Sequence, residues 1–201
     1  MYGIASHHES SPDWGALYGV AQAQSGYFTT EQAAAAGYSP QLLAKYLHSG
    51  RVVRVRRGVY RLVYFPASEH EDLVVLWLWA EQAGVFSHET ALALHDLSDV
   101  LPSKVHMTVP ASWQRRRLRI PTGVILHYAE ISNDERTGFY AVAVTTPGRT
   151  LRDCIEANVS PKLMRQAVFQ ARRRGLISEQ DGAALDGRGC RDGQPLSQPL
   201  P

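Results

Sequence analysis

The chain has 201 residues, 44% of them apolar, which suffices for one domain or two small ones with hydrophobic cores. Its formal net charge of +2 excludes a uniformly basic protein, so affinity for a polyanion must come from where the charges lie. The longest apolar run, LVVLWLWA, is too short for a membrane span, and the N-terminus lacks the pattern of a secretion signal. Neither Cys154 nor Cys190 has a CxxC neighbour, so we expect no zinc site and a location in the reducing cytoplasm. No cofactor is expected.

Three helices are predicted near the N-terminus, after a loose leader at residues 1–9. The first covers residues 14–24, and a short alanine-rich helix follows and stops at Gly37. The third has Ser39 as its N-cap, a proline at its first position and Gly50 just beyond its end. These start and stop signals predict three consecutive short helices.

A β-hairpin is predicted directly after the third helix, in the segment RVVRVRRGVYRL at residues 51–62. Val53 and Val55 alternate with arginines, the period of a half-buried strand, so we expect these valines and Leu62 to hold the hairpin to the core. Gly58 supplies the turn, after which the chain returns as a second strand. The order helix, helix, turn, helix, hairpin predicts a winged helix-turn-helix at residues 10–66.

The basic residues of this unit are unopposed, because no Asp or Glu occurs between Gln32 and Ser68. Such a local excess of cations is typical of a DNA-binding surface. On this hypothesis the polar side of the third helix faces base edges in the major groove, through Ser39, Gln41, Lys45 and His48. The cations that position the protein on phosphates are Arg51, Arg54, Arg56, Arg57 and Arg61. The alternative is a solvated hairpin whose charges only resist strand pairing.

The rest of the chain predicts a second, α+β domain at residues 67–186. Helices are expected at 69–83 and 87–97, strands at 104–110, 123–129 and 138–146, and further helices at 147–158, at 160–175 and from Ser178. Residues 187–201 are rich in Gly, Pro and Ser and are predicted to be disordered. The fold class is therefore α+β, with an N-terminal winged helix-turn-helix followed by a mixed α/β C-terminal domain.

An enzyme is not expected. A restriction-type nuclease commonly carries a D/E-x-K element, but none of the three lysines has an acid two positions before it. The sequence also lacks GxxxxGK[ST], GxGxxG, HExxH and GxSxG. A nuclease therefore remains only a rival hypothesis.

The N-terminal unit resembles a known family in the segment FTTEQAAAAGYSPQLLAKYLHSGRVVRVRRGVYRL. The shared pattern is G-R-x-x-R-x-R-x-G-V-Y, which begins here at Gly50 and ends at Tyr60. It is similar to the N-terminal winged helix-turn-helix of the AbiEi family, antitoxins and transcriptional regulators of type IV toxin–antitoxin systems. The likeness extends into residues 86–97 and 144–156, and it covers roughly residues 14–180.

The resemblance implies a repressor that binds double-stranded operator DNA at its own promoter. It also implies antagonism of a nucleotidyltransferase-type toxin, usually encoded beside it, without a stable complex between the two proteins. The alternative function is a protein- or RNA-interaction module without sequence-specific DNA binding.

Five polar residues of the second domain are candidates for an antitoxin or structural role: His88, His95, Thr150, Arg152 and Asp153. A metal site at the two histidines is disfavoured, because ligands on one helix usually lie closer together than seven residues. Capping or helix packing is favoured for the last three over a direct action against a toxin. The basic runs at 113–119 and 171–175 are interpreted as solvated surface, with an extended DNA track or an acidic or tRNA-like partner left open.

Overall fold

The computed structural model describes residues 11–189, so the predicted leader at 1–9 and residues 190–201 of the predicted tail lie outside the described part. The chain forms two compact units, residues 1–82 and 83–201. Each unit combines helices with a β-sheet, which confirms the α+β class. Within residues 11–189, every helix is too short or too polar to cross a lipid bilayer.

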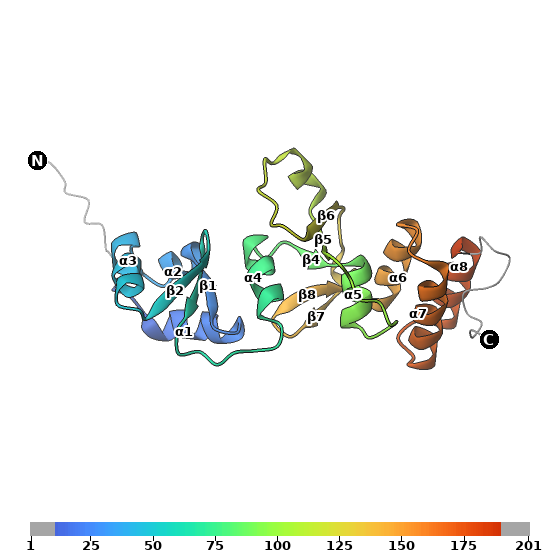
Figure 1. The fold of residues 1–201 in the computed structure, drawn as a ribbon, viewed down its shortest axis with the longest axis horizontal. Coiled ribbons are helices and arrows are strands. Elements are labelled where there is room, and N and C mark those ends of the chain that lie inside the picture. Colours follow the sequence, from blue (N-terminus) through green and yellow to red (C-terminus); the bar gives the residue numbers. More distant parts are fainter. Residues whose placement is uncertain (1–10, 190–201) are drawn as a thin grey trace, which may run out of the picture. The chain divides into compact units, whose positions relative to one another are not determined.

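The N-terminal unit contains four helices and a three-stranded sheet (Figure 1). Its elements are α1 (Trp14–Ala23), β1 (Tyr27–Thr29), α2 (Thr30–Ala35), α3 (Pro40–His48), β2 (Val52–Arg56), β3 (Val59–Leu62) and α4 (Glu71–Trp79). The first three helices begin at capping side chains: Asp13 accepts from the Ala16 amide at 2.9 Å, Thr29 caps α2 and Ser39 caps α3. Local capping therefore explains why these short segments are helical.

The end of α3 leads directly into the hairpin through a Schellman motif. The amide of Gly50 donates to the Leu47 carbonyl at 3.1 Å, and the amide of Arg51 donates to the Tyr46 carbonyl at 3.0 Å. Gly50 adopts a φ of 69°, which a residue with a Cβ adopts only at a cost. The motif fixes the direction in which the chain leaves α3 and enters β2.

Both faces of the three-stranded sheet are covered. Its strand order is β1-β3-β2, and both pairs are antiparallel. Phe28, Tyr60 and Leu62 pack with residues of α1, α2 and α3 in one hydrophobic core. Helix α4 contacts all three strands, and it lies on the other side of the sheet from α2 and α3 (Figure 1). The sheet is therefore a central layer of the unit.

The position of α4 differs from the expected domain boundary. A boundary after residue 66 would assign α4 to the second domain, whereas the compact units divide between Gln82 and Ala83. The reason is the sheet: Tyr27 and Val59 are only 4% and 2% exposed, and α4 packs against the strands that carry them. A helix of this apolar composition gains stability by covering that face.

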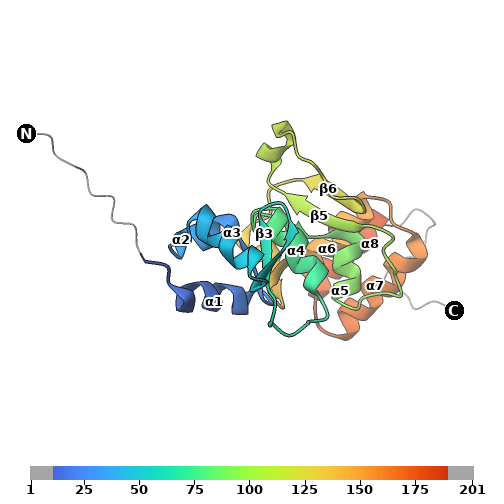
Figure 2. The same ribbon diagram turned by 60° about the vertical axis from the view of Figure 1, so that its left-hand side comes forward.

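The second unit is built on a mixed five-stranded sheet of order β6-β5-β4-β8-β7, in which β5 and β6 run side by side (Figure 2). Its strands are β4 (Val85–Phe86), β5 (Val105–Val109), β6 (Val124–Tyr128), β7 (Arg136–Phe139) and β8 (Val142–Thr145). Its α-helices are α5 (His88–Leu94), α6 (Pro147–Glu156), α7 (Pro161–Arg173) and α8 (Glu179–Gly189). Two short 3₁₀ helices occur at Ala111–Arg115 and Asn133–Glu135.

The helices of this unit share one core around Leu92, Leu151, Met164 and Val168. Two details differ from the expectation. The expected strand at 138–146 is a hairpin of β7 and β8 that turns at Tyr140, and the short buried strand β4 was not predicted. Helix α8 also continues to Gly189, so the first residues of the expected tail are helical.

Candidate nucleic-acid interface

Helix α3 has one buried and one exposed side, as its sequence predicts. Leu43 is buried with the core of the N-terminal unit, whereas Gln41, Lys45 and His48 are exposed. The predicted division of the helix is confirmed by this burial pattern. Because side chains three and four positions apart lie on one face, these three polar groups share the solvent side of α3.

Ser39 has a structural task at the start of the same helix. Its hydroxyl oxygen accepts a hydrogen bond from the Leu42 amide at 3.2 Å. This bond satisfies one of the amides that the first turn of a helix leaves without a partner. The side chain remains exposed, but the cap holds its orientation.

The hairpin exposes three arginines close to its turn: Arg54, Arg56 and Arg57. The turn itself lies at the start of α2, where the Thr30 amide donates to the Gly58 carbonyl at 3.0 Å. Gly58 has a φ of 79°, so the tight turn depends on a residue that tolerates this conformation. The three exposed arginines thus lie at or next to a tight turn that a hydrogen bond to Thr30 holds in place.

A β-bulge separates two of these arginines onto different faces of the hairpin. Arg54 lies opposite Tyr60, and Arg56 lies opposite Val59, so β2 contains one extra residue between the two pairs. Residues directly opposite each other point to the same face. Arg54 therefore shares the face of Tyr60, which packs with α1–α3, while Arg56 lies on the face that α4 covers further along the sheet.

The expectation that Val53 and Val55 hold the hairpin to the core is wrong. Their exposed fractions are 44% and 42%, whereas Val52 is 2% exposed. The physical reason is that β2 is an edge strand with an irregular register, so the simple alternation breaks after Val52. The core contacts come from Val52 and from β3 instead.

Arg51 lies at the base of the hairpin rather than near its turn. Its guanidinium carbon stands 5.2 Å from the centre of the Tyr46 ring, which is a cation–π geometry. Tyr46 in turn stacks on Trp14 of α1 at 6.4 Å. The Arg51 side chain is exposed at this aromatic surface.

Arg61 is placed apart from the other hairpin cations. Its Nη2 atom lies 3.1 Å from Oε1 of Glu71 and donates to the Phe65 carbonyl at 2.9 Å. The side chain is half-buried on the face of the sheet that α4 covers. The structure therefore places Arg54, Arg56 and Arg57 near the hairpin turn, with Arg54 and Arg56 on different faces, and separates Arg61 from them.

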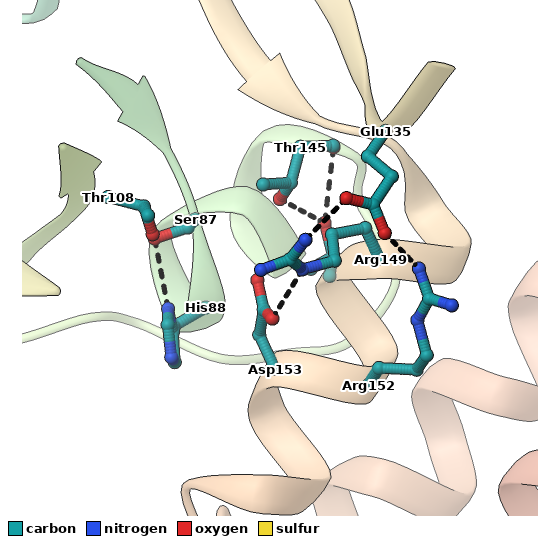
Figure 3. A network of polar contacts seen from close by, with 9 residues as sticks. Ser87, His88, Thr108, Glu135, Thr145, Arg149, Arg152 and Asp153 are labelled. Atoms are coloured by element: carbon teal, nitrogen blue, oxygen red, sulfur yellow. Dashed lines mark hydrogen bonds and ion pairs between the residues drawn. The ribbon is translucent and has the colours of Figure 1, made fainter. Parts of the chain in front are cut away.

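Two of the polar candidates of the second unit, Arg152 and Asp153, take part in an internal network (Figure 3). Arg149 bridges Glu135 at 2.5 Å and Asp153 at 2.7 Å, and Arg152 pairs with Glu135 at 2.6 Å. Burial raises the pKa of Asp153, against the opposing effect of Arg149. These contacts join the β7 end of the sheet to α6.

Thr150 and His95 also make internal bonds. The Thr150 hydroxyl lies 2.7 Å from that of Thr145 and 3.2 Å from the Thr145 carbonyl. The Nε2 atom of His95 donates to the same carbonyl at 2.7 Å. His88 lies elsewhere, with its Nδ1 atom 2.9 Å from the Ser87 hydroxyl. The structure thus separates the two histidines that the sequence placed on one helical face.

The two basic runs are partly used in packing. Arg116 stacks over the Trp113 ring at 4.1 Å, and Arg174 donates to the carbonyls of His95 and Asp96 at 2.7 and 3.0 Å. Arg115, Arg117, Arg119 and Arg173 are exposed.

Comparison with known proteins supports a family assignment for part of the chain. Residues 20–63 match the family described as a transcriptional regulator, AbiEi antitoxin. The resemblance inferred from the sequence is confirmed over these residues, which run from α1 to the end of the hairpin. The matched segment includes α3 and all five hairpin arginines, but neither residues 86–97 nor 144–156.

Among solved structures, the chain is similar to the RV2827C protein from Mycobacterium tuberculosis. The two share 13% sequence identity at a TM-score of 0.42, over 86% of this chain and 79% of that one. No curated protein matches the sequence.

Two groups of polar residues were missed from the sequence. Tyr27 and Glu71 form a bond that ties β1 to α4, and His106 and His127 lie beside His88. The alternating strand patterns placed each of these two histidines on a strand, but the pairing of the strands was not readable from the sequence.

Proposed function

We propose that residues 11–82 form a winged helix-turn-helix that binds double-stranded operator DNA, and that the chain is a transcriptional repressor and antitoxin. The element order α1-β1-α2-α3-β2-β3 and the strand order β1-β3-β2 support the winged helix-turn-helix. In this arrangement α3 enters the major groove and the β2–β3 hairpin meets the adjacent backbone.

The observation that carries the proposal is the joint exposure of two neighbouring cationic and polar surfaces. Gln41, Lys45 and His48 lie on the solvent side of α3, and Arg54 and Arg56 lie on the strand that directly follows it. No carboxylate from residues 32–68 neutralises them. Cations on such a surface release counterions when they contact phosphates, which favours binding to a polyanion.

The assignment of roles follows from these positions. Gln41 and Lys45 read base edges, with His48 at the far end of the same face, and Ser39 orients the first turn of α3. Arg54, Arg56 and Arg57 contact phosphates, and Arg51 supports the base of the hairpin. Because Arg61 is bound to Glu71, it stabilises the sheet and makes no phosphate contact.

The second part of the proposal concerns regulation. The likeness to AbiEi regulators over residues 20–63 supports autorepression of the chain's own promoter and antagonism of a nucleotidyltransferase-type toxin, without a stable complex. Co-expression of the chain with a nucleotidyltransferase reading frame beside its gene tests the second role. Restored growth supports the antitoxin function, and unchanged toxicity contradicts it while leaving the DNA-binding proposal intact.

Fluorescence anisotropy with two labelled duplexes tests operator binding. One duplex carries the DNA directly upstream of the reading frame, and the other has the same length and composition in shuffled order. We expect the upstream duplex to bind about 10³-fold more tightly at physiological salt. Equal affinity for both duplexes contradicts a repressor. Preference for a structured RNA of the same length favours the alternative, an RNA-interaction module.

A further inference from the structure

We propose that His88, His106 and His127 form a binding site for a divalent transition-metal ion of the zinc class in the second unit. Their ligand nitrogens all lie within 4.8 Å of one another. This site is independent of the DNA-binding surface proposed above, because its residues belong to other elements of the chain.

Three elements hold the histidines in one place. His88 is the first residue of α5, His106 belongs to β5 and His127 belongs to β6. Strands β5 and β6 run parallel, and Thr108 lies opposite His127, so these two side chains point to the same face of the sheet. His106 is two residues before Thr108 on β5 and therefore points to that face as well. Ligands that come from a helix start and two paired strands have little freedom to move apart.

The backbone around the cluster is fixed by hydrogen bonds. The Ser87 amide donates to the His106 carbonyl at 3.1 Å, and the His106 amide donates to the Thr90 hydroxyl at 2.8 Å. His88 itself adopts a φ of 52°, in the left-handed region that a non-glycine residue adopts at a cost. Such strain often marks a functional position, and here it sets the direction in which the His88 side chain leaves the backbone.

The distances suit a small ion. Zinc binds imidazole nitrogen at about 2.0–2.1 Å, so two ligands of a tetrahedral ion lie roughly 3.3 Å apart. Nδ1 of His106 and Nε2 of His127 are 3.1 Å apart. The His88 ring stacks on the His127 ring with their centres 3.6 Å apart, so ligation by all three histidines requires the His88 side chain to rotate out of this stack.

Neighbouring groups leave one nitrogen of two rings available as a ligand. Nε2 of His106 lies 3.3 Å from a carboxylate oxygen of Glu89. When the Nε2–H group donates a hydrogen bond to this carboxylate, Nδ1 carries the lone pair that can bind a metal ion. Nδ1 of His88 lies 2.9 Å from the Ser87 hydroxyl, which Thr108 in turn contacts at 2.8 Å (Figure 3). With the Nδ1–H group of His88 donating to the Ser87 hydroxyl, Nε2 carries the lone pair that can bind a metal ion. Metal-bound histidines commonly have such carboxylate or hydroxyl partners on their second nitrogen.

The donor set defines the class of ion. Three imidazoles suit zinc, copper, nickel or iron, whereas magnesium and calcium prefer oxygen ligands. Three protein ligands leave a fourth position for water. The side chain of Glu89, which contacts His106, is 32% exposed, so one edge of the cluster lies near solvent.

Calorimetric titration of the full, chelator-treated chain with Zn²⁺ tests the proposal. We expect one ion per chain, and we expect His106→Ala and His127→Ala each to weaken binding at least ~100-fold. Glu89→Gln, which keeps the three ligands but removes the carboxylate beside His106, should weaken it by about 10–100-fold. His70→Ala is the matched control, since it removes an imidazole that belongs to the N-terminal unit and should leave the affinity unchanged.

Thermal unfolding with and without Zn²⁺ tests metal binding by variants that are less stable than the wild-type chain. Zn²⁺ should raise the unfolding temperature of the wild-type chain, because it binds the folded state, while Mg²⁺ should not. The two cluster variants should lose this rise even where they melt at a lower temperature. Absence of Zn²⁺ binding by the wild-type chain, or binding that survives both cluster variants, overturns the proposal.

Discussion

Arg61 of β3 and Glu71 of α4 form an ion pair in which Nη2 and Oε1 are 3.1 Å apart. The other carboxylate oxygen of Glu71 accepts from the Tyr27 hydroxyl at 2.8 Å, and the Ser68 amide donates to Oε1 at 2.9 Å. Burial and the bond to Glu71 raise the pKa of Tyr27 to about 12. The Glu71 carboxylate thus links α4 to β1 and β3, and Arg61 of the basic hairpin stabilises the fold of the N-terminal unit.

Replacing Arg61 should therefore lower stability without changing DNA contacts. Arg61→Ala leaves a half-buried carboxylate short of its charged partner, so we expect the free energy of unfolding to fall by about 1.5–3 kcal/mol. Urea denaturation measures this loss. The salt dependence of DNA binding should stay at its wild-type value, and a changed salt slope would show that Arg61 contacts phosphate after all.

Gln41 and Lys45 should control which DNA sequence is preferred. Gln41→Ala or Lys45→Ala removes a group from the exposed side of α3 without disturbing its buried side. We expect a change in preference of roughly 1–3 kcal/mol at the affected base pair. Competition binding with single-base variants of the operator measures it. An equal loss of affinity for every sequence would assign these residues to backbone contacts instead.

Arg149 should be far more important for stability than its neighbour Arg152. The Asp153 side chain is 8% exposed and depends on Arg149, whereas the Arg152 side chain is 45% exposed. Arg149→Met should cost about 3 kcal/mol, since it leaves a buried carboxylate without its partner. Arg152→Met, the same chemical change three residues later, should cost less than about 1 kcal/mol. Thermal and urea unfolding of the two variants compare them, and equal losses would refute the proposed network.

The histidine cluster should make stability depend on pH in the absence of added metal. The ordinary pKa of histidine is 6.5, and that of His88 in the fold is about 3. Between these values the unfolded chain binds more protons than the folded chain, so stability falls as the pH is lowered below about 6.5. Glu89 offsets part of the effect at His106.

Urea unfolding at pH 7.5, 6 and 5 measures this dependence. His88→Gln, which cannot gain a proton in this range, should show a shallower fall in stability than the wild-type chain. An identical pH dependence in both proteins would assign the loss to other groups.

The N-terminal unit could be predicted largely from its local signals. Ser39, Pro40 and Gly50 set the limits of α3, and the spacing of its apolar residues identified the buried side. These features act within a few residues, so they are visible in the sequence. The fate of Val53 and Val55 depended on the edge position of β2 and on its bulge, which are properties of the assembled sheet.

Long-range pairing also explains what was missed in the second unit. His106 and His127 are 21 residues apart, and they meet only because β5 and β6 pair in parallel with one particular register. Glu71 similarly meets Tyr27 across 44 residues. Side-chain type and period indicated a strand or a helix in each case, but neither specifies which partner strand lies beside it.

The most direct test of the account is the salt dependence of operator binding by Arg54→Ala and Arg56→Ala. Each variant should bind every duplex more weakly, and each lost phosphate contact should reduce the slope of log affinity against log salt concentration by about 0.9. Lys162→Ala, which removes one exposed charge from the second unit, is the control and should keep the wild-type slope. Wild-type affinity and slope in both arginine variants would contradict the proposed interface.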